Sequence, residues 1–254
     1  MPISFLNTTG TGGLSLVNRN NSGRLTLTTP SSIISAGLIL NLDATNASSY
    51  PGTGTTWTDL SGQSNTGTLV NSPTYTSNPG YFTFASNKYA TTTKTNIALS
   101  SATFIAWVYS TQTQANYTGV IFNRNTYNGS TVPATGMDLY TNNSVGYHWN
   151  DSGATYNWNS GLITPNNAWS MIAITVNSTT ATAYLCQSSG ITTATNTTSH
   201  PSLSGLNFYI ATDPSSTTGR MFVGRIAIAL IYNTALTLSD ITTNFNAQKS
   251  RFGL

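Results

Sequence analysis

The segment Met221–Leu236, with the sequence MFVGRIAIALIYNTAL, constrains the fold more than any other part of the chain. In an extended strand, successive side chains point to opposite faces of the sheet. One face would carry Phe222, Gly224, Ile226, Ile228, Leu230 and Tyr232, and the other Val223, Arg225, Ala227, Ala229 and Ile231. Because both sets are largely apolar, the strand must be covered on both sides. We therefore expect a central strand in a two-sheet antiparallel β-sandwich.

A short helix is predicted directly after this strand. Thr237 and Asp240 have the spacing of a capping box, in which each side chain bonds to the other residue's backbone N–H. The apolar residues that follow on one helical face are Leu238, Ile241 and Phe245. The expected end of the helix is marked by the basic residues Lys249 and Arg251 and by the stop residue Gly253.

The C-terminal part of the chain resembles the closing motif of the laminin G-like, concanavalin A-like jelly-roll domains. The matching positions are Gly224, Ile226, Ile231-Tyr232-Asn233, Ala235-Leu236, Asp240 and Ile241. The resemblance extends, strand by strand, over roughly residues 38–254. It implies a jelly-roll fold and, by itself, no particular function.

One departure from the family pattern bears on partners. Where these domains usually carry acidic residues and an arginine, this chain has Ala227, Ile228 and Leu230. A face that is normally exposed to solvent in these domains is thus apolar in this chain. We expect a partner subunit or the chain's own N-terminal arm to cover it, with the interface at Ile226, Ile228 and Leu230.

Composition excludes several classes of protein. Only 6% of the 254 residues are charged, against about 25% in typical domains. The net charge of +3 is not concentrated in any Lys/Arg cluster, so we expect no nucleic-acid partner. The start, MPISFLNTTG, lacks the basic and apolar regions of a signal peptide, and no apolar run is long enough for membrane insertion. The single cysteine, Cys186, is interpreted as a small buried apolar residue.

Residues 1–35 differ from the rest of the chain. They contain two short β-like pieces, Leu14–Val17 and Arg24–Thr28, among Asn, Ser and Gly turn residues. This segment lacks the apolar mass to fold alone. We interpret residues 1–35 as an N-terminal arm that anchors to an assembly, and residues 36–254 as the sandwich.

The segment Val145–Asn159 reads as a β-hairpin with Asp151-Ser152-Gly153 at its turn. Its aromatic and polar residues make it the candidate glycan site, because sugars stack on aromatic rings and bond to polar side chains. The candidate residues are Tyr147, His148, Trp149, Asp151, Tyr156, Asn157 and Trp158. The alternative, which we favour for most of these rings, is that they fill the core. Trp57, Trp107 and Trp169 are predicted core residues.

Catalysis is disfavoured by the scarcity of acidic side chains. Glycoside hydrolysis normally requires two positioned carboxyl groups. The chain has no glutamate and six aspartates, Asp43, Asp59, Asp138, Asp151, Asp213 and Asp240, without the paired acidic motif of jelly-roll glucanases. There is no Gly-x-Ser-x-Gly motif for a nucleophile. If the protein is a hydrolase, Asp138 and Asp151 are the carboxyl groups to test.

Calcium is the one cofactor that the resemblance implies, since laminin G-like domains often bind it at one rim. Asp138 or Asp213 would supply the carboxylate, with backbone and Asn oxygens completing the site. The alternative is that Asp213, which precedes Pro214, opens a turn. Apart from calcium, no cofactor is expected.

The low charge, the arm and the apolar outer face together resemble laminin G-like proteins of bacteriophage particles. On this interpretation the protein is a non-enzymatic capsid decoration or tail-fibre component at the virion surface, made in the host cytoplasm. The arm would bind other virion proteins, the protein would form a homo-oligomer, and the sandwich would contact host-surface glycans. The alternatives are a free carbohydrate-binding module or adhesin and, third, a glycoside hydrolase.

Overall fold

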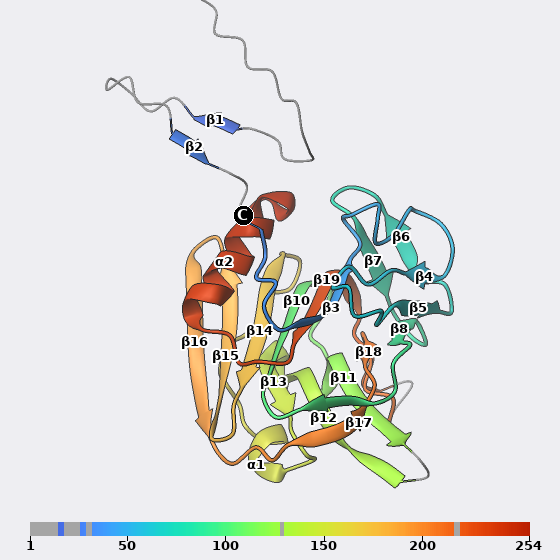
Figure 1. Cartoon of the computed structure of the whole chain (residues 1–254), viewed down its shortest axis with the longest axis vertical. Helices are drawn as coiled ribbons and strands as arrows, with labels where there is room; N and C mark the ends of the chain where they lie inside the picture. The colour runs from blue at the N-terminus through green and yellow to red at the C-terminus, as the bar shows by residue number, and fades with distance from the viewer. Residues whose placement is uncertain (1–14, 18–25, 29–31, 128–129, 216–218) are drawn as a thin grey trace, which may run out of the picture.

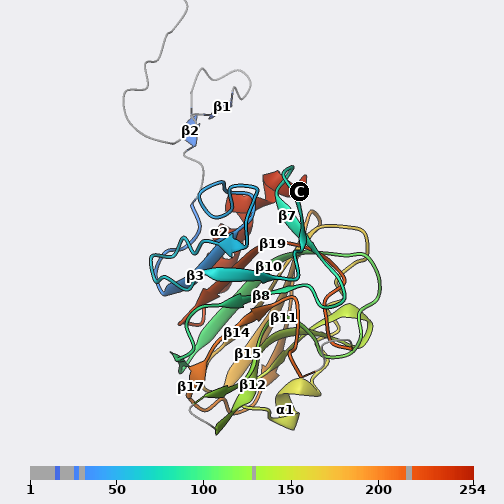
Figure 2. The same cartoon turned by 90° about the vertical axis from the view of Figure 1, so that its right-hand side faces the viewer.

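The structure is a computed structural model that describes residues 15–17, 26–28, 32–127, 130–215 and 219–254. Two large antiparallel sheets pack face to face, with the C-terminal helix on the outside of one of them (Figure 1; Figure 2). This arrangement confirms the predicted all-β sandwich with a short C-terminal helix.

The first sheet has eight strands. In spatial order, seven of them are β16 (Gly190–Thr197), β15 (Thr180–Gln187), β14 (Ser170–Val176), β10 (Ala102–Ser110), β19 (Gly224–Tyr232), β7 (Tyr81–Phe84) and β6 (Thr74–Thr76). The eighth, β3 (Leu38–Asp43), also pairs with β19. The segment predicted to be central therefore lies between β10 on one edge and β3 and β7 on the other.

The second sheet has seven strands. Their order is β13 (Ser144–His148), β12 (Ser130–Tyr140), β11 (Thr118–Tyr127), β18 (Tyr209–Ile210), β8 (Tyr89–Thr92), β5 (Gly67–Val70) and β4 (Thr56–Trp57). A smaller pair joins β17 (Leu203–Leu206) to β9 (Ile97–Leu99). Short helical turns lie at α1 (Gly153–Tyr156) and η1 (Thr141–Asn143).

A β-bulge in β19 corrects the simple alternation that the sequence predicts. Val108 of β10 is opposite Ile226 and Trp107 is opposite Ile228, so Ala227 is an extra residue. An extra residue in one strand shifts the alternation of side chains between the two faces. Ile226 therefore faces the core between the sheets, whereas Ile228, Leu230 and Tyr232 face the outside. The prediction had placed all four residues on one face.

The outer face of β19 is covered by the chain's own C-terminus. Helix α2 (Leu238–Gln248) starts with the predicted capping box between Thr237 and Asp240, and η2 (Lys249–Phe252) ends at Gly253 with a left-handed φ of 73°. The buried residues that pack onto the outer face are Ile241, Phe245 and Phe252. Leu238, which the prediction placed on the apolar face, is 53% exposed.

This packing corrects the predicted partner interface. Ile226, Ile228 and Leu230 are each 0% exposed within the single chain, so none of them offers a surface to a second protein. Two residues at the end of the predicted arm contribute, since Ile33 and Ile34 pack against the same cluster. Ile34 accepts a 3.0 Å hydrogen bond from the Tyr232 hydroxyl and donates one of 2.8 Å to Asn244.

Asp59 organises the first loop of the sandwich. Its two carboxylate oxygens accept hydrogen bonds from the backbone N–H groups of Asn41, Ser61 and Asn65 and from the Ser61 hydroxyl. A carboxylate with this many donors fixes the path of the chain around it. Asp59 is therefore a structural residue.

The two β-like pieces predicted in the arm are present as β1 (Ser15–Val17) and β2 (Thr26–Thr28), which pair antiparallel. The rest of the predicted arm up to residue 31 lies outside the described residues. No helix in the described part of the chain has the length and apolar character needed to cross a membrane.

Candidate functional site

The predicted hairpin at Val145–Asn159 is wrong in its second half. The first half forms the edge strand β13, but the chain then turns at Asn150 and Asp151, which have left-handed φ values of 55° and 51°. It continues into α1, whose Thr155 hydroxyl accepts the Trp149 N–H and donates to the carbonyl of Ser152. These local side-chain bonds give the backbone an alternative to a ladder, so the turn forms instead of a strand.

The aromatic residues of this segment divide between core and surface. Tyr147 and Trp149 are buried between the sheets, where the Tyr147 hydroxyl lies 2.9 Å from His200 Nε2 and Trp149 Nε1 donates to the carbonyl of Pro201. Trp158 is half-buried and packs on the same core. For Tyr147 and Trp149 the core interpretation holds, and these two rings are unavailable to a ligand.

The opposite side of β13 contributes to a cavity of about 280 Å³, here named the Tyr117 cavity. It is lined by Tyr117, Arg124, His148, Asp151, Tyr156 and Arg220. These residues come from β11 and the residue before it, the end of β13, the following turn, α1 and the loop before β19. Three of the predicted glycan residues, His148, Asp151 and Tyr156, are thus brought together, and Asn157 is adjacent because it accepts a hydrogen bond of 3.2 Å from the Tyr117 hydroxyl.

His148 is held in one orientation. Its Nδ1 lies 2.6 Å from Oδ2 of Asp138, which is buried on the neighbouring strand β12. The imidazole stacks on Tyr156 at 5.3 Å with an interplanar angle of 25°, and Tyr117 meets it edge-on at 5.6 Å. No described residue bonds to Nε2. A carboxylate on Nδ1 fixes both the ring and its tautomer, so Nε2 is the nitrogen left for a ligand.

Two arginines are fixed by one buried carboxylate. Asp213, which is 0% exposed, accepts hydrogen bonds from Arg124 Nε at 3.0 Å and from Arg220 Nη1 at 2.9 Å. Burial alone raises the pKa of Asp213, but the Ser215 N–H and the two guanidinium groups outweigh it and hold the pKa below its ordinary value. Arg220 also lies over the Tyr117 ring, 4.9 Å from its centroid.

The candidate calcium ligands take other roles. The Asp138 carboxylate is paired with His148, and the Asp213 carboxylate lies between two cations, which repel a metal ion. Within the described part of the chain, no group of three or more His, Cys, Asp or Glu side chains is close enough to hold a metal. Asp213 does open a turn, since its Oδ1 accepts the Ser215 N–H at 3.0 Å.

The sequence did not reveal Tyr117, Arg124 or Arg220 as site residues. Their contacts span 89 residues between Arg124 and Asp213, a distance that no local motif covers. The one signal available for the two arginines was that basic residues are rare, since the chain has only nine of them in 254 residues.

Of the predicted core tryptophans, Trp57 and Trp107 are fully buried, and Trp169 is half-buried.

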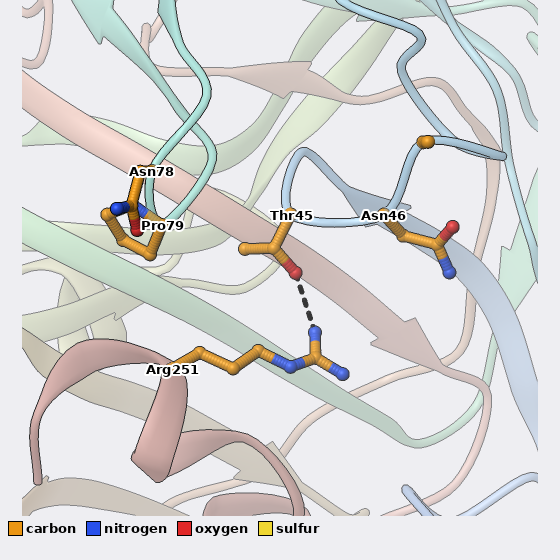
Figure 3. Close-up of a pocket in the computed structure, with 6 residues that line it drawn as sticks. Thr45, Asn46, Asn78, Pro79 and Arg251 are labelled. Carbon is orange, nitrogen blue, oxygen red and sulfur yellow. Dashed lines mark hydrogen bonds between the residues drawn. The ribbon is translucent and has the colours of Figure 1, made fainter. Parts of the chain in front are cut away.

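A second, larger cavity of about 520 Å³ lies between the loop after β3 and η2 (Figure 3). It is lined by Thr45, Asn46, Ala47, Asn78, Pro79 and Arg251. We name it the Arg251 cavity. It shares no lining residue with the Tyr117 cavity.

The fold is that of a jelly-roll sandwich, and comparison with known proteins agrees. Residues 84–242, more than half of the chain, match the family described as the concanavalin A-like lectin/glucanases superfamily (Laminin_G_3). The chain therefore belongs to this family.

Solved structures of low sequence identity share the fold. Domain 4 of AbnA, an extracellular arabinanase from Geobacillus stearothermophilus solved with arabinotriose, is 14% identical with a TM-score of 0.58, and the match covers 84% of this chain and 99% of that domain. A sialidase from Trypanosoma rangeli, solved with the inhibitor DANA, is 15% identical with a TM-score of 0.60. That match covers 87% of this chain and 34% of the sialidase. No curated protein sequence matches the chain.

Proposed function

We propose that this protein is a non-enzymatic, glycan-binding sandwich whose ligand occupies the Tyr117 cavity. The observation that carries the proposal is the set of side chains fixed around one cavity of about 280 Å³. Tyr117 and Tyr156 supply the ring surface that Arg220 and His148 do not cover for the C–H groups of a sugar, while Arg124, Asp151 and His148 supply donors and acceptors for hydroxyl groups. The similar arabinanase domain was solved in complex with arabinotriose, which supports a saccharide as ligand.

The proposal that the protein is not an enzyme rests on how the carboxyl groups near this cavity are bonded. Of the described aspartates at this cavity, Asp138 and Asp213 are buried in bonds to His148 and the two arginines, and Asp151 is exposed. A glycosidase needs two carboxyl groups that act on the same bond. We expect polysaccharides to be bound without turnover, and Asp151→Asn to change affinity alone.

Substitution of the two tyrosines tests the binding proposal. We expect wild-type protein to bind a subset of sugars on a glycan array, and Tyr117→Ala and Tyr156→Ala to weaken that binding about tenfold, as the loss of one stacking face costs about 1.4 kcal/mol. Tyr89→Ala is the matched control, since Tyr89 pairs with Tyr209 in the same sheet and does not line the cavity. Trp149→Ala is unsuitable because Trp149 is a core residue. Equal binding by all variants would refute the assignment.

We propose further that the sandwich is displayed on a bacteriophage particle, as a capsid decoration or tail-fibre component, and that residues 1–31 anchor it to other virion proteins. Two sequence features support this: an N-terminal segment with little apolar mass and a charged fraction of only 6%. The covered outer face of β19 no longer supports it, because α2 supplies the cover. The proposal includes a homo-oligomer, which the mass of the isolated protein tests.

Deletion of residues 1–31 tests the anchor. This deletion retains Ile33 and Ile34, which pack against the sandwich, so the truncated domain should still fold. We expect it to be absent from purified particles while full-length protein is incorporated. Incorporation of the truncated protein at the normal level would show that the arm is not the anchor.

A further inference from the structure

The Arg251 cavity is built from three separate segments. The loop after β3 contributes Thr45, Asn46 and Ala47, the loop between β6 and β7 contributes Asn78 and Pro79, and η2 contributes Arg251 (Figure 3). The wall between the first two segments is tight: a Cβ on Gly80 would lie 2.5 Å from the carbonyl oxygen of Ala44. The two loops are therefore packed backbone to backbone at this point.

One nitrogen of the Arg251 guanidinium group holds the side chain in place. Its Nη1 donates to Asp43 Oδ2 and to Thr45 Oγ1, both at 2.7 Å. Asp43 is itself fixed, since its Oδ1 accepts from the N–H and the hydroxyl of Thr45. The ion pair therefore does not depend on a ligand, and its geometry is set before one arrives.

The other edge of the guanidinium group is free to bind. Arginine has five N–H donors, and no described residue bonds to the three on Nε and Nη2 of Arg251. The Asn46 amide oxygen accepts the Ser48 N–H at 2.9 Å, which leaves its NH₂ group as a donor. Figure 3 shows the guanidinium group between Asn46 on one side and the Asn78–Pro79 segment on the other. The lining is thus rich in donors.

We propose that this cavity binds a carboxylated sugar, as in a uronic acid, with the carboxylate on the Nε/Nη2 edge of Arg251. A planar fork of N–H donors matches a carboxylate in two parallel hydrogen bonds. A volume of about 520 Å³ is larger than a carboxylate alone requires. The amides of Asn46 and Asn78 suit the hydroxyl groups of a sugar ring, whereas the apolar part of the lining is limited to Ala47 and Pro79.

The main competing interpretation is that Arg251 only ties η2 to β3. That tie uses Nη1 alone and leaves the N–H groups on Nε and Nη2 of Arg251, which lines the cavity, without a partner among the described residues. The site is also independent of the glycan proposed for the Tyr117 cavity, because the two cavities share no residue. Either assignment can therefore fail alone.

Titration of the full-length protein with glucuronate tests the proposal, with binding followed by calorimetry. We expect saturable binding of glucuronate and at least tenfold weaker binding of glucose and of acetate. Arg251→Lys keeps a positive charge opposite Asp43 but removes the fork, so it should weaken glucuronate binding at least tenfold. Asn78→Ala should weaken it severalfold, and because Asn78 is exposed this variant carries the test if Arg251→Lys is unstable.

Tyr117→Ala is the control for the other cavity and should bind glucuronate like the wild type. Three results would overturn the proposal: no saturable glucuronate binding, unchanged affinity in both Arg251→Lys and Asn78→Ala, or loss of binding in Tyr117→Ala. Acetate that binds as tightly as glucuronate would overturn the assignment to a sugar.

Discussion

The buried carboxylate of Asp213 accepts a 2.9 Å hydrogen bond from Nη1 of Arg220, seven residues further along the chain. The same carboxylate holds Arg124 of β11 from its other oxygen. One acidic side chain thereby fixes both cationic walls of the Tyr117 cavity. The stability of the fold and the shape of the site are coupled at this residue.

Asp213→Asn should destabilise the protein by about 3 kcal/mol, since it leaves Arg220 without its counterion and Arg124 with only Asp151, 3.7 Å away. The change should also reduce the dependence of the protein's stability on pH. The pKa of Asp213 is lowered in the folded protein, so its ionised carboxylate stabilises the fold. This stabilisation is fully present above the ordinary pKa near 4 and is lost as the pH falls through the lower pKa of the folded protein. Urea unfolding at pH 7 and pH 3 measures both effects. Equal acid sensitivity in wild type and variant would contradict the prediction.

Phe252→Ala should cost about 3 kcal/mol of unfolding free energy. The Phe252 ring stacks on Trp107 with centroids 4.2 Å apart and also contacts Trp169 at 4.8 Å. Its loss would loosen η2 over the outer face of β19. Leu238→Ala, at a position 53% exposed, is the control and should change stability little. Thermal unfolding of the two variants compares them directly.

Gly119→Ala should destabilise the second sheet by about 3 kcal/mol, because no space exists for a methyl group. A Cβ at this position would lie 2.3 Å from the backbone carbonyl of Thr212, next to Asp213. We also expect weaker ligand binding in the Tyr117 cavity, as the backbone that carries Asp213 must move. Gly153→Ala is the matched control, since its nearest neighbour would be 3.6 Å away. A stable Gly119→Ala protein with normal binding would show that this contact is not needed.

Cys186 should resist thiol reagents in the folded protein. The side chain is fully buried in β15, and burial raises the pKa of its thiol to about 12. Because the thiolate is the reactive form, labelling at pH 8 should be slow in native protein and rapid after unfolding in urea. Fast labelling of native protein would indicate that β14 and β15 open locally.

Much of the fold could be predicted because its signals are local. The central position of β19 followed from apolar residues on both faces of a nine-residue strand, and the start of α2 from two residues three positions apart. The second strand of the predicted hairpin failed because Thr155 bonds to the backbone of Trp149 and Ser152, a preference that a period-2 pattern does not register.

The sequence by itself determined a two-layer sandwich, since the alternation of apolar residues and the capping pattern depend on neighbours only a few positions away. The tertiary structure alone decided what covers β19, because the bulge at Ala227 changes which side chains face outward and α2 folds back over them. It also decided the sites: Tyr117 and Arg220, or Thr45 and Arg251, become neighbours only through packing between distant segments. Side-chain identity sets what chemistry is available, and long-range packing sets where that chemistry is assembled.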